Sequence, residues 1–294
     1  MNIIKYRKIF FIISAALILA SIVSLSVWHL KLGIDFTGGS LLEVKYAGTA
    51  SVNSEIKDKL AQFNLGEVNV TPAENNSVIL RFKDIDEATH QNILHSLGDV
   101  EEKSFESVGP VIGAELMRRA IYAIALVILM IVIYIAWAFR KVSRPISSWQ
   151  YGIATLIALL HDVIIPVGIF AILGHFLGVE IGLLFVTAVL TILGFSVHDT
   201  IVVFDRIREN LRRHIGDNFE DTVNRSINQT ISRSINTSFT VLLTLLAVYF
   251  FGGESIRYFA LALIVGIIFG TYSSIFIASP LLVLWEGWKK KKKG

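Results

Sequence analysis

Two aspartates and one arginine stand within or beside long apolar stretches, where charged side chains are costly and mark functional sites. Asp162 follows His161 and Asp199 follows His198, each pair inside an apolar run, and Arg233 stands just before another such run. Burial favours the neutral form of a carboxyl and a nearby arginine favours its charged form. A carboxyl that alternately meets and leaves an arginine can therefore bind and release a proton, so these residues predict a proton path.

Six apolar segments approach or exceed the ~20 residues that cross a bilayer as a helix. The composition agrees, because 53% of residues are hydrophobic and 17% are charged, against about 25% charged in soluble domains. We therefore expect a polytopic α-helical membrane protein. Its first segment is too long for a cleavable signal and is expected to remain as an anchor. The predicted spans are residues 9–30, 119–139, 150–173, 181–204, 234–251 and 256–286.

The helical rise of 1.5 Å per residue places the charged side chains by depth. Asp162 falls roughly 19 Å from the cytoplasmic start of the third span, and Asp199 about 9 Å above the cytoplasmic end of the fourth. Arg233 falls at a height comparable to that of Asp199, so these two are expected to pair. The alternative is that both aspartates hold helices together by hydrogen bonds. His161 and His198 point about 100° away from the aspartates and are secondary candidates, expected to be structural hydrogen-bonding groups.

Polar side chains recur along the fourth span and could line a wet seam beside Asp199. They are Thr187, Thr191, Ser196 and Thr200.

The basic residues predict the orientation of the chain. With the N-terminus inside, 17 of the 27 Lys and Arg fall on the cytoplasmic side, and both chain ends lie there. Residues 205–236 are expected to form a cytoplasmic helical connector at the interface. The basic tail, residues 289–294, is expected to contact membrane lipid and not nucleic acid. The expected domains are residues 1–30, 31–113, 114–288 and 289–294.

Residues 31–113 form the one large polar segment, expected outside the membrane with 7 Lys and Arg against 13 Asp and Glu. Its pattern reads β-α-β-β-α-β, an order that predicts a small ferredoxin-like α+β domain between the first two spans. The expected strands are residues 41–46, 67–71, 77–83 and 103–108, with a turn around Pro72 and Asn75-Asn76, and the expected helices are residues 52–63 and 86–97.

Glycine-rich joints flank this domain. The first, GIDFTGGS, matches the phosphate-loop pattern G-x-x-x-x-G-K-[ST] except that Gly39 stands in place of the lysine. We expect no nucleotide there, because the loop lies outside, lacks the lysine and leads into a strand instead of a helix N-terminus. The joints are expected either to let the domain move relative to the membrane or to form tight turns. Their candidate residues are Gly33, Asp35, Gly38, Gly39, Gly109 and Gly113.

The chain resembles the SecF members of the SecD/SecF family, subunits of the bacterial Sec translocon. The similarity appears in order along nearly the whole sequence. It is carried by Gly33–Ser40, Val108–Leu116, Leu160–Val163, Ser196–Asn210 (SVHDTIVVFDRIREN) and Val223–Ser238 (VNRSINQTISRSINTS).

The resemblance implies half of a bundle related to resistance-nodulation-division (RND) exporters, in a multi-pass protein of the bacterial cytoplasmic membrane. It implies a proton-driven role in late preprotein translocation, with proton-path residues at Asp199 and Arg233 and no catalytic activity. His198 departs from the family pattern, in which many members carry asparagine. The implied partners are a SecD-like subunit, the translocon channel with its small accessory membrane proteins, and the translocating preprotein, with no cofactor, metal or nucleotide.

Three alternatives belong to other functional classes. A small-molecule exporter of the RND superfamily usually has twelve spans and two large outer domains, whereas this chain is expected to have six spans and one outer domain. A structural scaffold of the translocon would use its buried acids only for hydrogen bonds. An intramembrane aspartyl protease needs two facing aspartates at similar depth, whereas Asp162 and Asp199 are expected to lie roughly 10 Å apart along the membrane normal.

Overall fold

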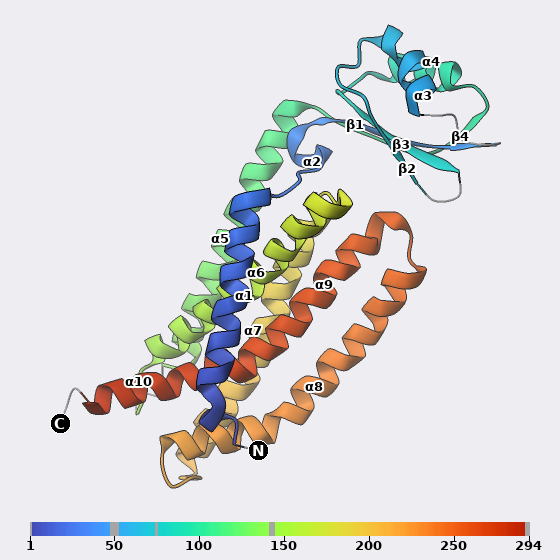
Figure 1. Cartoon of the computed structure of the whole chain (residues 1–294). Coiled ribbons are helices and arrows are strands. Elements are labelled where there is room, and N and C mark those ends of the chain that lie inside the picture. The colour runs from blue at the N-terminus through green and yellow to red at the C-terminus, as the bar shows by residue number, and fades with distance from the viewer. Residues whose placement is uncertain (1, 48–52, 74–75, 141–144, 292–294) are drawn as a thin grey trace. The chain divides into compact units, whose positions relative to one another are not determined.

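The computed structural model describes residues 2–47, 53–73, 76–140 and 145–291 (Figure 1). The chain divides into two compact units, Met1–Lys31 with Tyr122–Gly294, and Leu32–Ile121. Asn75 of the expected turn, the first residue of the expected helix 52–63 and the last three residues of the basic tail fall outside the described ranges.

The first unit is helical, and six of its helical segments are long and apolar enough to cross a membrane, which confirms the predicted spans. α6 packs against α1, α7 and α9, while α8 packs against α7 and α9. The helices are α1 (Arg7–Trp28), α5 (Pro110–Ala138, which begins in the other unit), α6 (Ser148–Leu177), α7 (Leu183–Arg212), α8 (Phe219–Phe251), α9 (Glu254–Ser273) and α10 (Ser279–Lys291).

The predicted connector is not a separate element. α7 runs unbroken to Arg212 and α8 begins at Phe219, so most of residues 205–236 extends two of the spanning helices. The side chain of Asn218 starts α8 by accepting a hydrogen bond from the Asp221 backbone N–H at 2.9 Å. Both helices continue from an apolar segment into a polar one without a break. The change from apolar to polar residues therefore does not mark the end of a helix.

The sixth predicted span is interrupted. α9 ends at Ser273 and is followed by a π-helical segment, Ser274–Ala278, before α10 begins at Ser279. Pro280 has no backbone N–H, so it cannot continue a regular α-helical hydrogen-bond ladder. Figure 1 shows α10 leaving the direction of α9 at this point. Single-turn π-segments are often found at functional sites.

Helix α1 crosses α6 at close range. A Cβ atom added to Gly168 would lie 2.4 Å from Ser21 Cβ, so only glycine fits there. The Ser24 hydroxyl donates to the Gly168 carbonyl at 3.0 Å. Small residues let membrane helices approach closely, and this contact ties the first span to the third.

The second unit is a four-stranded antiparallel sheet in the order β2-β3-β1-β4, with two helices between strands. This order confirms the predicted ferredoxin-like sandwich. Its core is formed by apolar side chains that the strands and helices bury together, among them Leu42, Val44, Ile56, Leu80 and Ile93. The elements are β1 (Gly39–Tyr46), α3 (Asn53–Leu60), β2 (Asn69–Pro72), β3 (Ser77–Phe82), α4 (Glu87–Leu97) and β4 (Val100–Val108).

The entry to this unit contains a helical turn that was not predicted. Ile34–Thr37 form the short helix α2, with Gly33 at its N-cap and Gly38 at its C-cap, and β1 begins directly afterwards. The Thr37 hydroxyl donates to the carbonyl of Gly33 at 3.0 Å and to that of Gly38 at 3.1 Å. The loop leads into a strand as expected, since β1 begins at Gly39, but the turn before it was not predicted because one turn closed by glycine needs no apolar periodicity to form.

Candidate functional site

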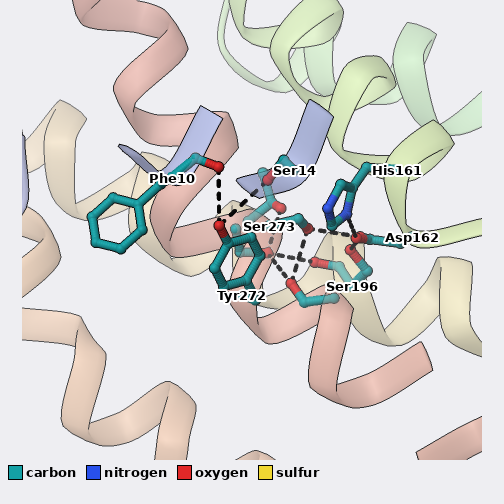
Figure 2. Close-up of polar contacts among 10 residues, drawn as sticks. Phe10, Ser14, His161, Asp162, Ser196, Tyr272 and Ser273 are labelled. Atoms are coloured by element: carbon teal, nitrogen blue, oxygen red, sulfur yellow. Dashed lines mark hydrogen bonds and ion pairs between the residues drawn. The ribbon is translucent and has the colours of Figure 1, made fainter. Parts of the chain in front are cut away.

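Asp162 lies at the centre of a buried polar cluster formed by α6, α7 and α9. Its side chain is fully buried. The hydroxyls of Ser196 and Ser273 donate to Asp162 Oδ2 at 2.5 Å and 2.8 Å, and His161 Nδ1 lies 2.9 Å from Oδ1. Figure 2 shows these three side chains converging on the carboxyl group. Asp162 thus connects three helices through one side chain.

His161 extends this cluster toward α1. Its ring stacks on Tyr272, with centroids 5.9 Å apart, while its Nε2 is buried with no hydrogen-bond partner among the described residues. The Tyr272 hydroxyl donates to the Phe10 carbonyl at 3.1 Å and lies 3.4 Å from the Ser14 hydroxyl (Figure 2). The expected structural role of His161 remains a prediction.

Asp199 lies one turn further along α7 in a second polar cluster. It is buried, and the Ser234 hydroxyl of α8 donates to its Oδ1 at 3.2 Å. Its Oδ2 is buried and has no hydrogen-bond partner in the described part of the chain. An acceptor of this kind is costly to leave unsatisfied when it is charged, so Asp199 has an open position for a proton.

Hydroxyl groups connect the two clusters at the π-helical segment. The hydroxyls of Thr200 and Ser274 lie 2.8 Å apart, and Ser274 also donates to the carbonyl of Ser196 at 3.3 Å. A further pair, Ser238 and Thr271, joins α8 to α9 at 2.5 Å. Of the predicted seam, Ser196 and Thr200 are buried here, whereas Thr187 and Thr191 are exposed and donate to carbonyls of their own helix.

Arg233 is not in ion-pair contact with Asp199. Its side chain is exposed on α8 and it makes no ion pair with the described residues. One residue along an α-helix rotates the side chain by about 100°, so Ser234 faces Asp199 while its neighbour points elsewhere. His198 is likewise exposed on α7. The structure thus brings Asp199 into contact with Ser234 and leaves Arg233 and His198 exposed.

The two aspartates are closer in depth than predicted. Asp162 bonds to Ser196, which precedes Asp199 by three residues, or about 4.5 Å of helical rise. The earlier estimate of roughly 10 Å assumed helices without tilt that start at one level, and membrane helices are commonly tilted. No hydrogen bond joins the two carboxyls within the described residues, and each has its own set of partners, so they do not form a facing pair.

Several residues of the two polar clusters were not singled out from the sequence. Ser273, Tyr272 and Ser274 belong to a run of four hydroxyl-bearing residues, Thr271–Ser274, in an otherwise apolar segment. That run is the feature that could have indicated them, because consecutive polar residues in a span need buried partners.

The glycine joints separate into tight and open positions. A Cβ atom at Gly38 would lie 2.7 Å from Pro110 Cα, at Gly39 it would lie 2.8 Å from the Phe82 carbonyl oxygen, and at Gly113 it would lie 3.0 Å from Gly38 N. Gly38 and Gly39 also have positive φ angles of 74° and 120°. At Gly109 nothing lies within 4 Å. The first and second joints therefore pack on each other within the α+β unit.

These features define a class of protein: a polytopic membrane protein with carboxyl groups buried among hydroxyls inside a helix bundle, and a small ferredoxin-like domain between its first two spans. The chain matches the family model "Protein export membrane protein SecD/SecF, C-terminal" over residues 89–288 and the "SecD/SecF GG Motif" over residues 23–50. The chain belongs to the SecD/SecF family of protein export membrane proteins.

Individual relatives agree with this assignment. The chain is 49% identical to the protein translocase subunit SecF of Thermobaculum terrenum, over 97% of this chain and 94% of that protein. It is 37% identical to the protein translocase subunit SecDF of Brucella abortus, over 92% of this chain and 35% of that protein. The crystal structure of SecDF from Thermus thermophilus, described as a translocon-associated membrane protein, matches with a TM-score of 0.82 and 33% identity, over 98% of this chain and 39% of that one.

Proposed function

We propose that this protein is an accessory subunit of the Sec protein-export machinery that uses the proton motive force to assist late steps of preprotein translocation. The names of its relatives support the export role, since they are protein translocase subunits. The proton role is supported by one observation above all: Asp199 is buried in the bundle and its Oδ2 has no hydrogen-bond partner among the described residues.

A SecD-like subunit is the proposed principal partner. SecDF relatives carry the region similar to this chain within a much longer protein, of which it spans 35–39%. In the most apolar stretch of each of two spanning helices, α5 and α8, only 11% of the stretch is buried within this chain. Those faces are available to a second subunit or to lipid. Further proposed partners are the translocon channel, its small accessory membrane proteins and the translocating preprotein.

Arg233 fits this arrangement as a residue of the subunit interface. It is exposed on α8 next to Ser234, which contacts Asp199. An arginine beside a carboxyl favours the charged form. Movement of α8 against a partner subunit could therefore bring Arg233 toward Asp199 or take it away, and change whether the carboxyl holds a proton.

The proposed location is the cytoplasmic membrane, with both chain ends on the cytoplasmic side. The concentration of Lys and Arg in the segments assigned to that side supports this orientation. The α+β unit then lies on the outer side, where the polypeptide emerges.

A structural scaffold of the translocon is the second candidate, favoured by the complete set of hydrogen bonds at Asp162. Substitution Asp199→Asn separates the two functions in inverted membrane vesicles that export a preprotein. We expect the variant to co-purify normally with its SecD-like partner and to lose the part of export that depends on the proton gradient. The matched control is Asp205→Asn, an exposed acid on the same helix. Gradient-driven export that survives in a normally assembled Asp199→Asn complex would favour the scaffold.

A further inference from the structure

Asp162 is a fully buried carboxyl that the proposed role of Asp199 does not require. An ionised carboxylate only accepts hydrogen bonds. In the ionised state Asp162 Oδ1 accepts from His161 Nδ1, and Oδ2 accepts from the hydroxyls of Ser196 and Ser273. This arrangement satisfies a buried charge with three donors, which is the condition under which such a charge is tolerated.

The same side chains can also satisfy a protonated Asp162. A protonated carboxyl adds one O–H donor that needs an acceptor. The hydroxyl of Ser273 lies 2.8 Å from Asp162 Oδ2 and also 3.1 Å from the carbonyl oxygen of Gly270. When Oδ2 carries a proton, it can donate to Ser273 Oγ, and Ser273 can turn its own proton to the Gly270 carbonyl. One hydroxyl rotation thus exchanges the two states and keeps Asp162 and Ser273 hydrogen-bonded in both.

His161 is a poorer place for that proton. Its Nε2 is buried and has no partner among the described residues, so a proton there would create a buried N–H donor with no acceptor. The ring faces Tyr272 of α9, whose hydroxyl already donates to the carbonyl of Phe10. Among the described residues Asp199 of α7 is a further titratable group, one turn from Ser196, while α1 contributes the neutral side chain of Ser14.

We propose that Asp162 is a second proton-binding residue of the bundle, and that Ser273 is the hydroxyl whose hydrogen bond reverses when the proton binds. The inference rests on the proposed proton-driven function, but it concerns a different carboxyl. Ser273 ends α9 directly before the π-helical segment, and the Gly270 carbonyl that accepts from it also accepts from Ser274 at 3.0 Å. The reversal therefore takes place where Ser274 contacts Thr200, the neighbour of Asp199.

Infrared difference spectroscopy tests this directly, using the complex with its SecD-like partner in lipid vesicles as the pH is changed. The C=O stretch of a protonated carboxyl reports proton binding, and its frequency rises when the group loses hydrogen bonds. We expect one carboxyl band to vanish in Asp162→Asn and a different band to vanish in Asp199→Asn. Bands unchanged by Asp162→Asn would overturn the proposal, whereas bands unchanged by Asp199→Asn would count against the proposed function.

Variants of Ser273 test the reversal with Asp162 intact. Ser273→Ala is expected to shift the Asp162 band to higher frequency, because the O–H of the protonated Asp162 carboxyl then lacks an acceptor. Ser273→Thr, which keeps a hydroxyl, is expected to return the band to its wild-type frequency. Ser279→Ala is the matched control, since the Ser279 hydroxyl donates to Ser274 O and not to Asp162. If Asp162→Asn does not assemble, Asp162→Glu must move the same band. A band that stays fixed in both Ser273→Ala and Asp162→Glu contradicts the assignment.

Discussion

The hydroxyl of Ser234 on α8 donates to Asp199 Oδ1 on α7 at 3.2 Å. The neighbouring Arg233 is exposed and makes no ion pair with this carboxyl among the described residues. Asp199 is thus held by a neutral donor, and the arginine that could stabilise its charge stands outside. We expect the charge of Asp199 to change when α8 moves, because the Ser234 hydroxyl can donate to the ionised carboxylate and can accept from the protonated carboxyl.

Ser234→Ala removes the hydrogen bond that positions Asp199. Hydrogen bonds to charged groups contribute about 1.5–3 kcal/mol, so we expect proton-gradient-driven export to fall by about tenfold or more while the complex still assembles. Export assays in inverted vesicles measure this. Thr237→Ala is the matched control, since that hydroxyl donates only to the Arg233 backbone carbonyl among the described residues. Equal export in the two variants would show that Ser234 does not position the acid.

Gly38→Ala tests the packing of the two glycine joints within the α+β unit. The added Cβ would meet the Pro110 backbone at 2.7 Å with φ at 74°, and strained positions of this kind cost of order 1–3 kcal/mol. We expect lower export, and a similar loss for Gly39→Val, with no nucleotide binding before or after. Gly109→Ala, which meets nothing within 4 Å, should behave as the wild type. A comparable defect in Gly109→Ala would mean that export depends on the glycine content of the joints and not on the contact between Gly38 and Pro110.

Gly168→Ala tests the crossing of α1 and α6. Overpacking a close contact typically costs about 1–3 kcal/mol, and the new methyl would overlap Ser21. We expect a lower Tm for the detergent-solubilised protein, measured as loss of the monodisperse peak after heating. Gly194→Ala on α7 is the control, because nothing lies within 4 Å of that position. Equal Tm values for the two variants would show that the close packing of Gly168 on Ser21 does not contribute to stability.

Asp86→Ala tests the start of α4. The Asp86 carboxylate accepts the Thr89 backbone N–H at 2.9 Å, and the hydrogen bonds from Thr89 hold the pKa of Asp86 below its usual value. A lowered folded-state pKa stabilises the fold above the unfolded pKa, and that contribution disappears as pH falls through the folded pKa. We expect faster hydrogen exchange in residues 87–97 of Asp86→Ala at neutral pH, and protection factors that converge with the wild type in acid. Asp86→Asn, which keeps a capping oxygen, should retain protection without this pH dependence.

The spans and the ferredoxin-like unit were predictable because they depend on strong patterns. Apolar runs of span length are unmistakable, and the alternation of strands and helices fixed the order of the small domain. The continuity of α8 was not predicted: its polar N-terminal part was expected in a connector separate from the fifth span, although the residues up to Arg233 lead into that span without any breaker. The break after Ser273 was also hidden, since π-helical geometry has no periodicity of its own in the sequence.

The site was predicted in part. Asp162 and Asp199 were found because charge in an apolar run is conspicuous. Their hydroxyl partners were missed, apart from the seam on α7, because Ser and Thr are common in membrane helices. The pairing of Asp199 with Arg233 stays a prediction, because depth along the membrane fixes height and says nothing about the direction in which a side chain points.

The central claim is that Asp199 carries protons through this bundle. Its most direct test is proton uptake into proteoliposomes that contain the complete complex, followed with a trapped pH-sensitive dye under an imposed membrane potential. We predict that Asp199→Asn abolishes the uptake above the protein-free background, while Asp205→Asn retains it. Uptake by a fully assembled Asp199→Asn complex at the wild-type rate would contradict the account.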